Sequence, residues 1–135
     1  MRKGRTVLEA KRYGIYSCSR QMTLMGAARE ILERDVSALV VVEEDGALAG
    51  VISRTDLLRA CTEREDWPVQ SVAAYMSQDV VTVSPQTPLC EVADLLLQNH
   101  IHRVIVVRTE GDKARPVAVV SDGDFIYHMV KDGAE

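Results

Sequence analysis

The stretch Gly50-Val51-Ile52-Ser53-Arg54-Thr55-Asp56 determines how the rest of this sequence is interpreted, because it recurs as Ala118-Val119-Val120-Ser121-Asp122-Gly123-Asp124. In each copy an apolar run, typical of the end of a buried strand, leads into a serine, and an aspartate follows three positions later. Apolar pairs that favour a helix come next, Leu57-Leu58 in the first copy and Phe125-Ile126 in the second. The sequence therefore predicts two equivalent strand-to-helix junctions.

The serine and the aspartate of each junction allow two interpretations. A hydroxyl beside the first N–H groups of a helix suits a phosphate, and an ionised carboxylate, which only accepts hydrogen bonds, suits the two hydroxyls of a ribose. The same Ser-x-x-Asp pattern is also a capping box, which needs no ligand. A single copy does not separate these interpretations, and the duplication favours the nucleotide pocket.

The duplication extends over nearly the whole chain. A shift of 65 residues aligns Val7 with Val72, and a shift of 68 aligns Ser53 with Ser121, after three extra residues in the second hairpin. We predict a first repeat at residues 1–62, which includes an N-terminal extension, a linker at residues 63–68, and a second repeat at residues 69–135.

Each repeat is predicted to follow the order β-α-β-β-α. In the first repeat an extended piece at 14–18 precedes a helix, and a β-branched run at 38–42 precedes a turn, the strand that ends in the repeated serine, and the last helix. In the second repeat we expect Thr87 to cap the first helix and Pro88 to occupy its first position. The apolar residues of that helix recur at helical spacing, namely Leu89, Val92, Ala93, Leu96 and Leu97.

These elements predict an α+β fold made of two repeats with pseudo-twofold symmetry. Each repeat has too few residues to bury its apolar face alone. We expect the two sheets to pack together through their helices around one shared core. Two clefts would then lie between the repeats, each lined by one strand-to-helix junction.

Composition excludes several classes of function. The chain of 135 residues has 16 basic and 20 acidic residues, and this net charge of −4 argues against nucleic acid as a partner. No stretch approaches the roughly 20 apolar residues that cross a bilayer, and no signal-peptide pattern follows the N-terminus, so no membrane association is expected.

No pattern in the sequence predicts a metal site or a catalytic centre. The three cysteines, Cys18, Cys61 and Cys90, lack metal-type spacing and fit reduced thiols in a cytoplasmic protein. His100 and His102 would form half of a metal site, but no third ligand accompanies them. No nucleophile motif or phosphate-binding loop is found, so we expect no enzymatic activity.

The sequence resembles the cystathionine β-synthase (CBS) domain, which occurs in tandem as the Bateman module. The resemblance rests on the duplicated stretch that ends in Asp56 and Asp124, on residues 72–77 followed by 80–83, and on residues 102–107. It covers nearly the whole chain, with the motifs in order and duplicated.

The resemblance implies a regulatory sensor of an adenosine nucleotide rather than an enzyme. AMP, ADP or ATP is the implied ligand, with S-adenosylmethionine or NAD(H) as further members of the ligand class. In this family the aspartate binds ribose and the serine contacts phosphate, and an adjacent threonine and a His-Arg pair also reach phosphate. The adenine lies against backbone that precedes or enters the first strand. The corresponding residues are Asp56, Asp124, Ser53, Ser121, Thr55, His102, Arg103, Tyr16 and Val81.

The two copies depart from each other at positions that matter for a ligand. The first repeat has Ser37-Ala38 where the second has His102-Arg103, so the basic contribution is unequal. Ala118 replaces the glycine of the signature, and we expect its methyl group to crowd the cleft beside it. The two sites are therefore expected to differ.

The leading hypothesis is a stand-alone, cytoplasmic energy-sensing module that binds its nucleotide between the repeats and signals to a target protein in trans. Ligand would shift the population of relative orientations of the repeats. The resemblance also implies a homodimer, for which contact between the repeated apolar helices provides a physical basis. Two alternatives stay open: a dimerisation or docking module with vestigial pockets, and a redox or metal sensor that uses the cysteines and histidines.

Overall fold

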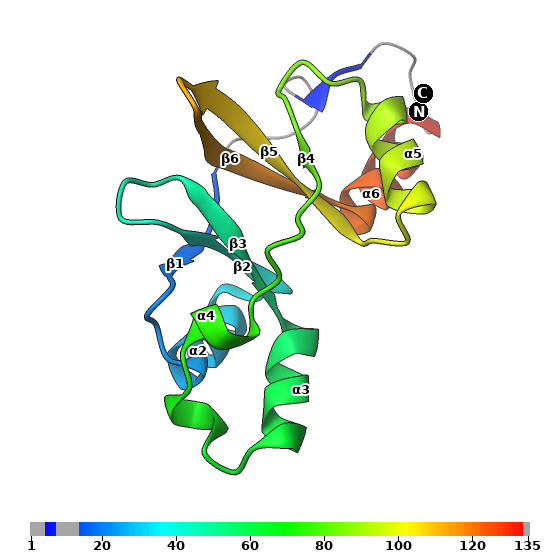
Figure 1. Ribbon diagram of the computed structural model, residues 1–135. Helices are drawn as coiled ribbons and strands as arrows, with labels where there is room; N and C mark the ends of the chain where they lie inside the picture. The colour runs from blue at the N-terminus through cyan, green and yellow to red at the C-terminus, as the bar shows by residue number, and fades with distance from the viewer. Residues whose placement is uncertain (1–4, 8–13, 134–135) are drawn as a thin grey trace.

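The computed structural model describes residues 5–7 and 14–133, which form two three-stranded sheets flanked by helices (Figure 1). The first repeat comprises β1 (Ser17–Ser19), α2 (Leu24–Arg34), β2 (Ala38–Val42), β3 (Leu48–Ser53) and α3 (Arg54–Glu63). A connection with η1 (Trp67–Val69) and α4 (Val72–Tyr75) follows. The second repeat comprises β4 (Thr82–Val83), α5 (Leu89–Gln98), β5 (Arg103–Glu110), β6 (Lys113–Ser121) and α6 (Asp122–Gly133). The predicted order β-α-β-β-α, twice, is confirmed.

The two sheets have the same topology and the same irregularity. In each sheet the first strand pairs in parallel with the second, across a helical connection, and the second pairs antiparallel with the third. The register shifts between Val41 and Val42 in the first sheet, and between Val106 and Val107, 65 positions later, in the second. The duplication seen in the sequence is therefore preserved down to a single bulge.

The first helices of the repeats begin differently. Thr23 caps α2, because its hydroxyl accepts the N–H of Gly26 at 3.1 Å. The expectation that Thr87 caps α5 is wrong, because the capping position is occupied by Pro88, which is extended. The hydroxyl of Thr87 instead accepts the N–H of Ser84 at 3.1 Å and closes the turn that precedes the helix.

The sheets pack face to face, and the helices cover their outer faces, so the expectation that the sheets meet through their helices is wrong. In Figure 1 the strands lie in the middle of the molecule, with α2, α3 and α4 at one end and α5 and α6 at the other. The core between the sheets is centred on Val40, Val51 and Ile105, which come from β2, β3 and β5. Strand residues alone form the centre of the contact between the repeats.

The alternation of side chains along a strand explains this packing. Leu39 and Val41 of β2 point into the core shared with α2 and α3, whereas Val40 between them points into the core between the sheets. In β5, Val104 and Val106 face the helices of the second repeat, and Ile105 faces the other sheet. Two apolar faces on one strand need two covering layers, which are the helices of its own repeat and the sheet of the other.

The segment before each repeat packs against the other repeat. Val7 is fully buried in the core of the second repeat, and Val72 is fully buried in the core of the first. Isolated bridges join Thr6 to Pro88 and Ser71 to Thr23. The two bridges are equivalent, because Ser71 lies 65 positions after Thr6 and Pro88 lies 65 positions after Thr23. This exchange interlocks the repeats, and neither core is complete without a residue from the other half of the chain.

Gly50 and Ala118 occupy equivalent positions with different surroundings. A methyl group on Gly50 would overlap the backbone oxygen of Ser77, because Val51 and Ser77 form a bridge whose N–H···O distances are both 2.9 Å. Ala118 is fully buried in the core of the second repeat, with Val104 and Phe125. Its methyl group therefore fills core space, and the expectation that it crowds a cleft is wrong.

We predict that Gly50→Ala lowers the free energy of unfolding by about 1–3 kcal/mol, because the added methyl group must displace the backbone at Ser77. Urea unfolding followed by circular dichroism measures this change. Gly123→Ala is the matched control, because a methyl group there meets the Ser121 hydroxyl oxygen at an ordinary 3.6 Å within a helix. Equal stability of the Gly50→Ala variant and the parent would contradict the close approach.

Candidate functional site

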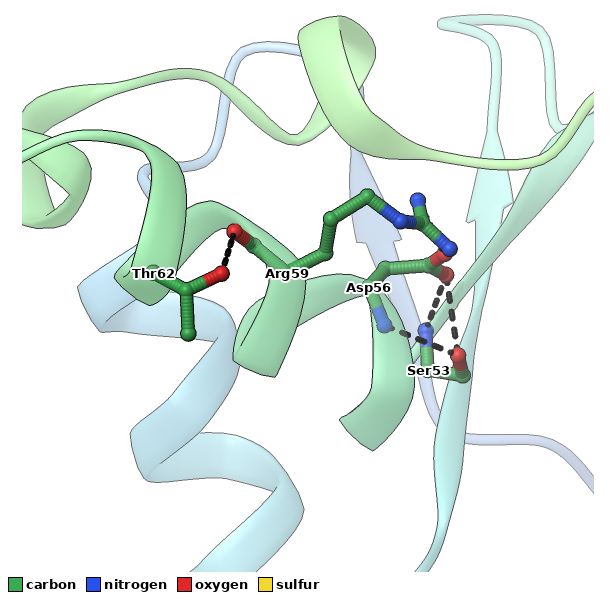
Figure 2. A network of polar contacts seen from close by, with 4 residues as sticks. All are labelled: Ser53, Asp56, Arg59 and Thr62. Atoms are coloured by element: carbon green, nitrogen blue, oxygen red, sulfur yellow. Dashed lines mark hydrogen bonds and ion pairs between the residues drawn. The ribbon is translucent and has the colours of Figure 1, made fainter.

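The first strand-to-helix junction is a complete capping box (Figure 2). The Ser53 hydroxyl accepts the backbone N–H of Asp56 at 3.3 Å, and Asp56 Oδ2 accepts the N–H and the hydroxyl of Ser53 at 2.8 and 2.9 Å. Arg59 Nη1 lies 3.4 Å from the other carboxylate oxygen. Asp56 is only 8% exposed, so its carboxylate is already engaged in holding the start of α3.

The second junction shares two of these contacts. Asp124 Oδ2 accepts the N–H of Ser121 at 2.8 Å and its hydroxyl at 3.2 Å. Asp124 is half-buried, and thus more accessible than its counterpart Asp56. Both aspartates therefore support helix starts, and the second is the better placed of the two to meet a ligand.

A cleft of about 400 Å³, here called the inter-repeat cleft, opens beside the second junction. The first repeat contributes the segment before β1 and the turn before β2, and the second contributes the start of β5 and the end of β6. Its walls combine apolar and polar groups, with a volume in the range of small-molecule sites. The lining residues are Gly14, Ile15, Tyr16, Asp35, Val36, Ser37, Ala38, Arg103, Val119, Ser121 and Asp124.

Arg103 is the cationic centre of this cleft. It opens β5, is half-buried, and donates from Nη2 to the Ser37 hydroxyl of the other repeat at 3.3 Å. Burial is the main cause that lowers the pKa of Arg103, and the nearby charge of Arg54 lowers it further, whereas the carboxylates of Asp122 and Asp56 raise it. The guanidinium nevertheless stays protonated at neutral pH. Within residues 5–7 and 14–133, no carboxylate lies within 4 Å of this guanidinium. A positive charge is thus held between the repeats by a neutral hydroxyl.

A second cavity of about 410 Å³, here called the junction pocket, lies between the starts of α3 and α6. It shares Ser37, Arg103 and Ser121 with the inter-repeat cleft, so the two cavities adjoin at these residues. Its other lining residues are Ser53, Arg54, Thr55, His102, Asp122 and Gly123.

His102 stands at the outer edge of the junction pocket. Its Nδ1 lies 3.0 Å from Asp122 Oδ2, and both side chains are largely exposed. The hydrogen bond from His102 is the main cause that lowers the pKa of Asp122, with smaller contributions from the backbone N–H of Gly123 and from Arg103. The pair directs the Asp122 carboxylate toward the imidazole.

The structure divides the expected site residues among three environments. Tyr16, Arg103, Ser121 and Asp124 meet in the inter-repeat cleft. Ser53, Thr55 and His102 line the junction pocket, together with Arg103 and Ser121. The other two lie elsewhere: Asp56 is buried under Arg59, and Val81 packs against the core of the second repeat while its carbonyl accepts the N–H of Ile105.

Several lining residues were not singled out as site residues by the sequence. Asp35 takes a left-handed conformation at the end of α2 and faces the cleft, and Val119 reaches it because alternate residues of β6 point away from the helices. Arg54 and Asp122 lie inside the duplicated stretch, but at positions where the two copies differ. A comparison of the copies at every position, rather than at the shared ones alone, would have identified them.

The thiols and histidines do not converge. Burial raises the pKa of the Cys18 thiol to about 11, with a smaller contribution from Glu30, whereas Cys61 and Cys90 are exposed. No group of three His, Cys, Asp or Glu side chains suited to a metal ion occurs in the described part of the chain. No helix among the described residues is long and apolar enough to cross a membrane.

Two interlocked β-α-β-β-α units, with polar cavities where their strands meet their helices, define a tandem-repeat α+β module. The family model of the CBS domain matches residues 10–63 and 72–131, and the chain belongs to this family. This confirms the resemblance noted in the sequence.

Several proteins are similar to this chain in sequence. The chain is 28% identical over 123 residues to the mitochondrial CBS domain-containing protein CBSX3 of Arabidopsis thaliana, covering 87% of this chain and 58% of that protein. It is 27% identical over 117 residues to the CBS domain-containing protein YhcV of Bacillus subtilis, covering 86% and 79%. It also spans 58% of a 17.7 kDa protein of Acidianus ambivalens, at 28% identity over 98 residues.

Two solved structures similar to this chain contain adenosine compounds. The CBS domain pair of protein MJ0100, in complex with 5′-methylthioadenosine and S-adenosyl-L-methionine, has a TM-score of 0.84 at 22% identity and covers 95% of this chain and 98% of its own. CBSX2 in complex with AMP has a TM-score of 0.82 at 21% identity and covers 96% and 99%. At these identities the likeness establishes the fold.

We predict that Asp56→Ala lowers the free energy of unfolding by about 1–2 kcal/mol, because it removes the acceptor for the Ser53 N–H and hydroxyl. Chemical denaturation measures the loss. Arg59→Ala is the control, since it removes only the half-exposed ion pair and should cost about 0.5 kcal/mol or less. A larger loss for Arg59→Ala than for Asp56→Ala would contradict the capping role.

Proposed function

We propose that this chain is a regulatory module that binds an adenosine nucleotide of the AMP, ADP or ATP class in the inter-repeat cleft. The observation that carries the proposal is Arg103, a half-buried guanidinium whose hydrogen-bond partner is the neutral hydroxyl of Ser37. Partial burial of a charge costs free energy unless a counter-charge compensates it. A phosphate group supplies such a charge and accepts paired hydrogen bonds from a guanidinium.

The other walls of the cleft suit the remaining parts of a nucleotide. Asp124 offers a carboxylate for the ribose hydroxyls, and Ser121, whose hydroxyl donates to Asp124, lines the same cleft. Ile15, Tyr16 and Val119 provide apolar surface for a base. The AMP and S-adenosylmethionine complexes of similar folds support the choice of an adenosine ligand.

The regulatory mechanism that we propose follows from the two-sided construction of the cleft. Tyr16 and Ser37 come from the first repeat, and Arg103 and Asp124 from the second. A ligand that contacts both stabilises one relative orientation by its differential affinity, and a target protein that recognises this orientation receives the signal in trans. A binding module of this kind acts by regulation rather than by catalysis, and we propose that it reports nucleotide levels in the cytoplasm.

We also propose that the module forms a homodimer through its outer helices. Leu32 on α2 and Leu58 on α3 are largely exposed, and so are Leu97 and Ile126 at the equivalent positions of α5 and α6. Apolar side chains repeated on the outer faces of both repeats suit a self-complementary contact in a twofold dimer.

The capping box at Ser53, together with the similar contacts of Ser121, favours a second candidate function, a dimerisation or docking module with vestigial pockets. The contacts of Ser53 with Asp56, and of Ser121 with Asp124, need no ligand. The third hypothesis, a redox or metal sensor, has less support, because the thiol of Cys18 is buried and its raised pKa keeps it protonated at neutral pH.

We expect AMP, ADP or ATP to raise the melting temperature of nucleotide-stripped protein, whereas guanine nucleotides leave it unchanged. A ligand at 100 times its dissociation constant adds about 2.7 kcal/mol of stability if it binds only the folded state. A thermal-shift panel that also contains S-adenosylmethionine and NADH measures the response. No shift with any adenosine compound would contradict the proposal and favour the docking module.

We predict that Arg103→Ala weakens AMP binding at least tenfold and leaves adenosine binding nearly unchanged, because the guanidinium contacts phosphate. Asp124→Asn keeps an acceptor for the Ser121 N–H, removes the charge that holds the ribose, and should weaken adenosine and AMP equally. Isothermal titration calorimetry measures both effects, with Arg29→Ala on the exposed face of α2 as the control. Equal losses of adenosine and AMP on Arg103→Ala would refute the phosphate contact.

A further inference from the structure

The junction pocket continues the inter-repeat cleft on the far side of Arg103. Ser37, Arg103 and Ser121 line both cavities, so a group that contacts Arg103 from the cleft lies next to the junction pocket. The cleft and the pocket have volumes of about 400 and 410 Å³. A nucleotide with one phosphate at Arg103 would leave the junction pocket unfilled.

The charges around the junction pocket suit an anion. Two guanidiniums, from Arg54 and Arg103, line it together with a single carboxylate, from Asp122. The Asp122 carboxylate is held by His102 at 3.0 Å, on the exposed edge of the pocket. After burial, repulsion by Arg54 is a further cause that lowers the pKa of Arg103, so the two cations lie close enough to oppose each other. An anion between them would relieve this repulsion.

The two repeats carry opposite charges at one position that lines the junction pocket. Arg54 is the first residue of α3, and its counterpart at the start of α6, 68 positions later, is Asp122. The backbone around both is the same, because the N–H of Arg54 donates to the carbonyl of Ser37 at 3.0 Å and that of Asp122 donates to His102 at 2.9 Å. These main-chain bonds do not involve the side chains of Arg54 and Asp122. The equivalent main-chain bonds therefore do not determine which side chain stands at this position.

From this geometry we propose that the junction pocket receives the phosphate groups beyond the first, and that Arg54 makes the protein prefer a nucleoside triphosphate to the monophosphate. The inference rests on the proposed nucleotide site and deepens it. Arg103 holds the first phosphate at the boundary between the cavities, Arg54 attracts the distal phosphates, and Asp122 opposes them. Thr55 supplies a hydroxyl donor along the pocket wall, whereas the Ser53 hydroxyl already donates to Asp56.

The test measures AMP, ADP and ATP binding to the full chain by isothermal titration calorimetry, with and without Mg²⁺. The parent should bind ATP at least tenfold more tightly than AMP. Arg54→Gln should weaken ATP binding about five- to tenfold and change AMP binding less than twofold, since a charge-assisted contact at an exposed site is partly screened. Asp122→Asn should strengthen ATP binding severalfold with AMP unchanged. Arg54→Lys should retain most of the ATP affinity, and Arg29→Gln, the exposed control, should match the parent.

The outcomes separate this inference from the proposed function. The inference would be overturned, and the nucleotide site left intact, if the parent bound AMP and ATP with equal affinity. The same would follow if Arg54→Gln lowered the affinities for AMP and ATP equally. An absence of binding by every nucleotide would overturn the site and the inference together. Unfolding of Arg54→Gln and Asp122→Asn is followed in parallel by circular dichroism. Because the two substitutions are expected to change ATP affinity in opposite directions, a change of the same sign in both would also overturn the inference.

Discussion

The arrangement of this molecule depends on the need to cover both faces of β2 and β5 with apolar surface. Leu39 and Val41 require the helices of their own repeat, and Val40 requires the sheet of the other. Once the sheets stack, the edges where strands end and helices begin face each other across the repeat boundary. The inter-repeat cleft and the junction pocket both lie at that boundary, so the hydrophobic packing of the strands fixes where polar groups can converge.

The residues at the junctions combine structural and proposed binding roles. Asp56 and Asp124 each accept two hydrogen bonds from a serine that precedes a helix. A carboxylate held in this way keeps a fixed position and does not have to be ordered when a ligand arrives, which reduces the entropic cost of binding. The two sites nevertheless differ, since Asp56 is buried beside Arg59 and Asp124 lines an open cleft.

Much of the fold could be predicted from the sequence, because periodicity and duplication are local properties. The order of elements and the two junctions follow from the duplicated stretch. The packing of sheet on sheet could not be predicted, because the run at 38–42 has the same pattern whether a helix or a second sheet covers its outer face. Thr87 was misassigned because threonine suits a turn as well as a helix cap. Arg54 and Asp122 escaped notice because a repeat is recognised by what its copies share, whereas these residues are where the copies differ.

The exchanged segments before the two repeats bear on how such a chain could arise. Val7 completes the core of the second repeat, and Val72 completes the core of the first. In a lone repeat of this geometry the leading segment would have no core to pack into, and the core would lack the segment that completes it. A second copy would supply a core for the segment and a segment for the core. Gene duplication and fusion of a swapped dimer would join these copies in one polypeptide. Each half would then be free to change its side chains, and Arg54 opposite Asp122 is the kind of divergence that such a history permits.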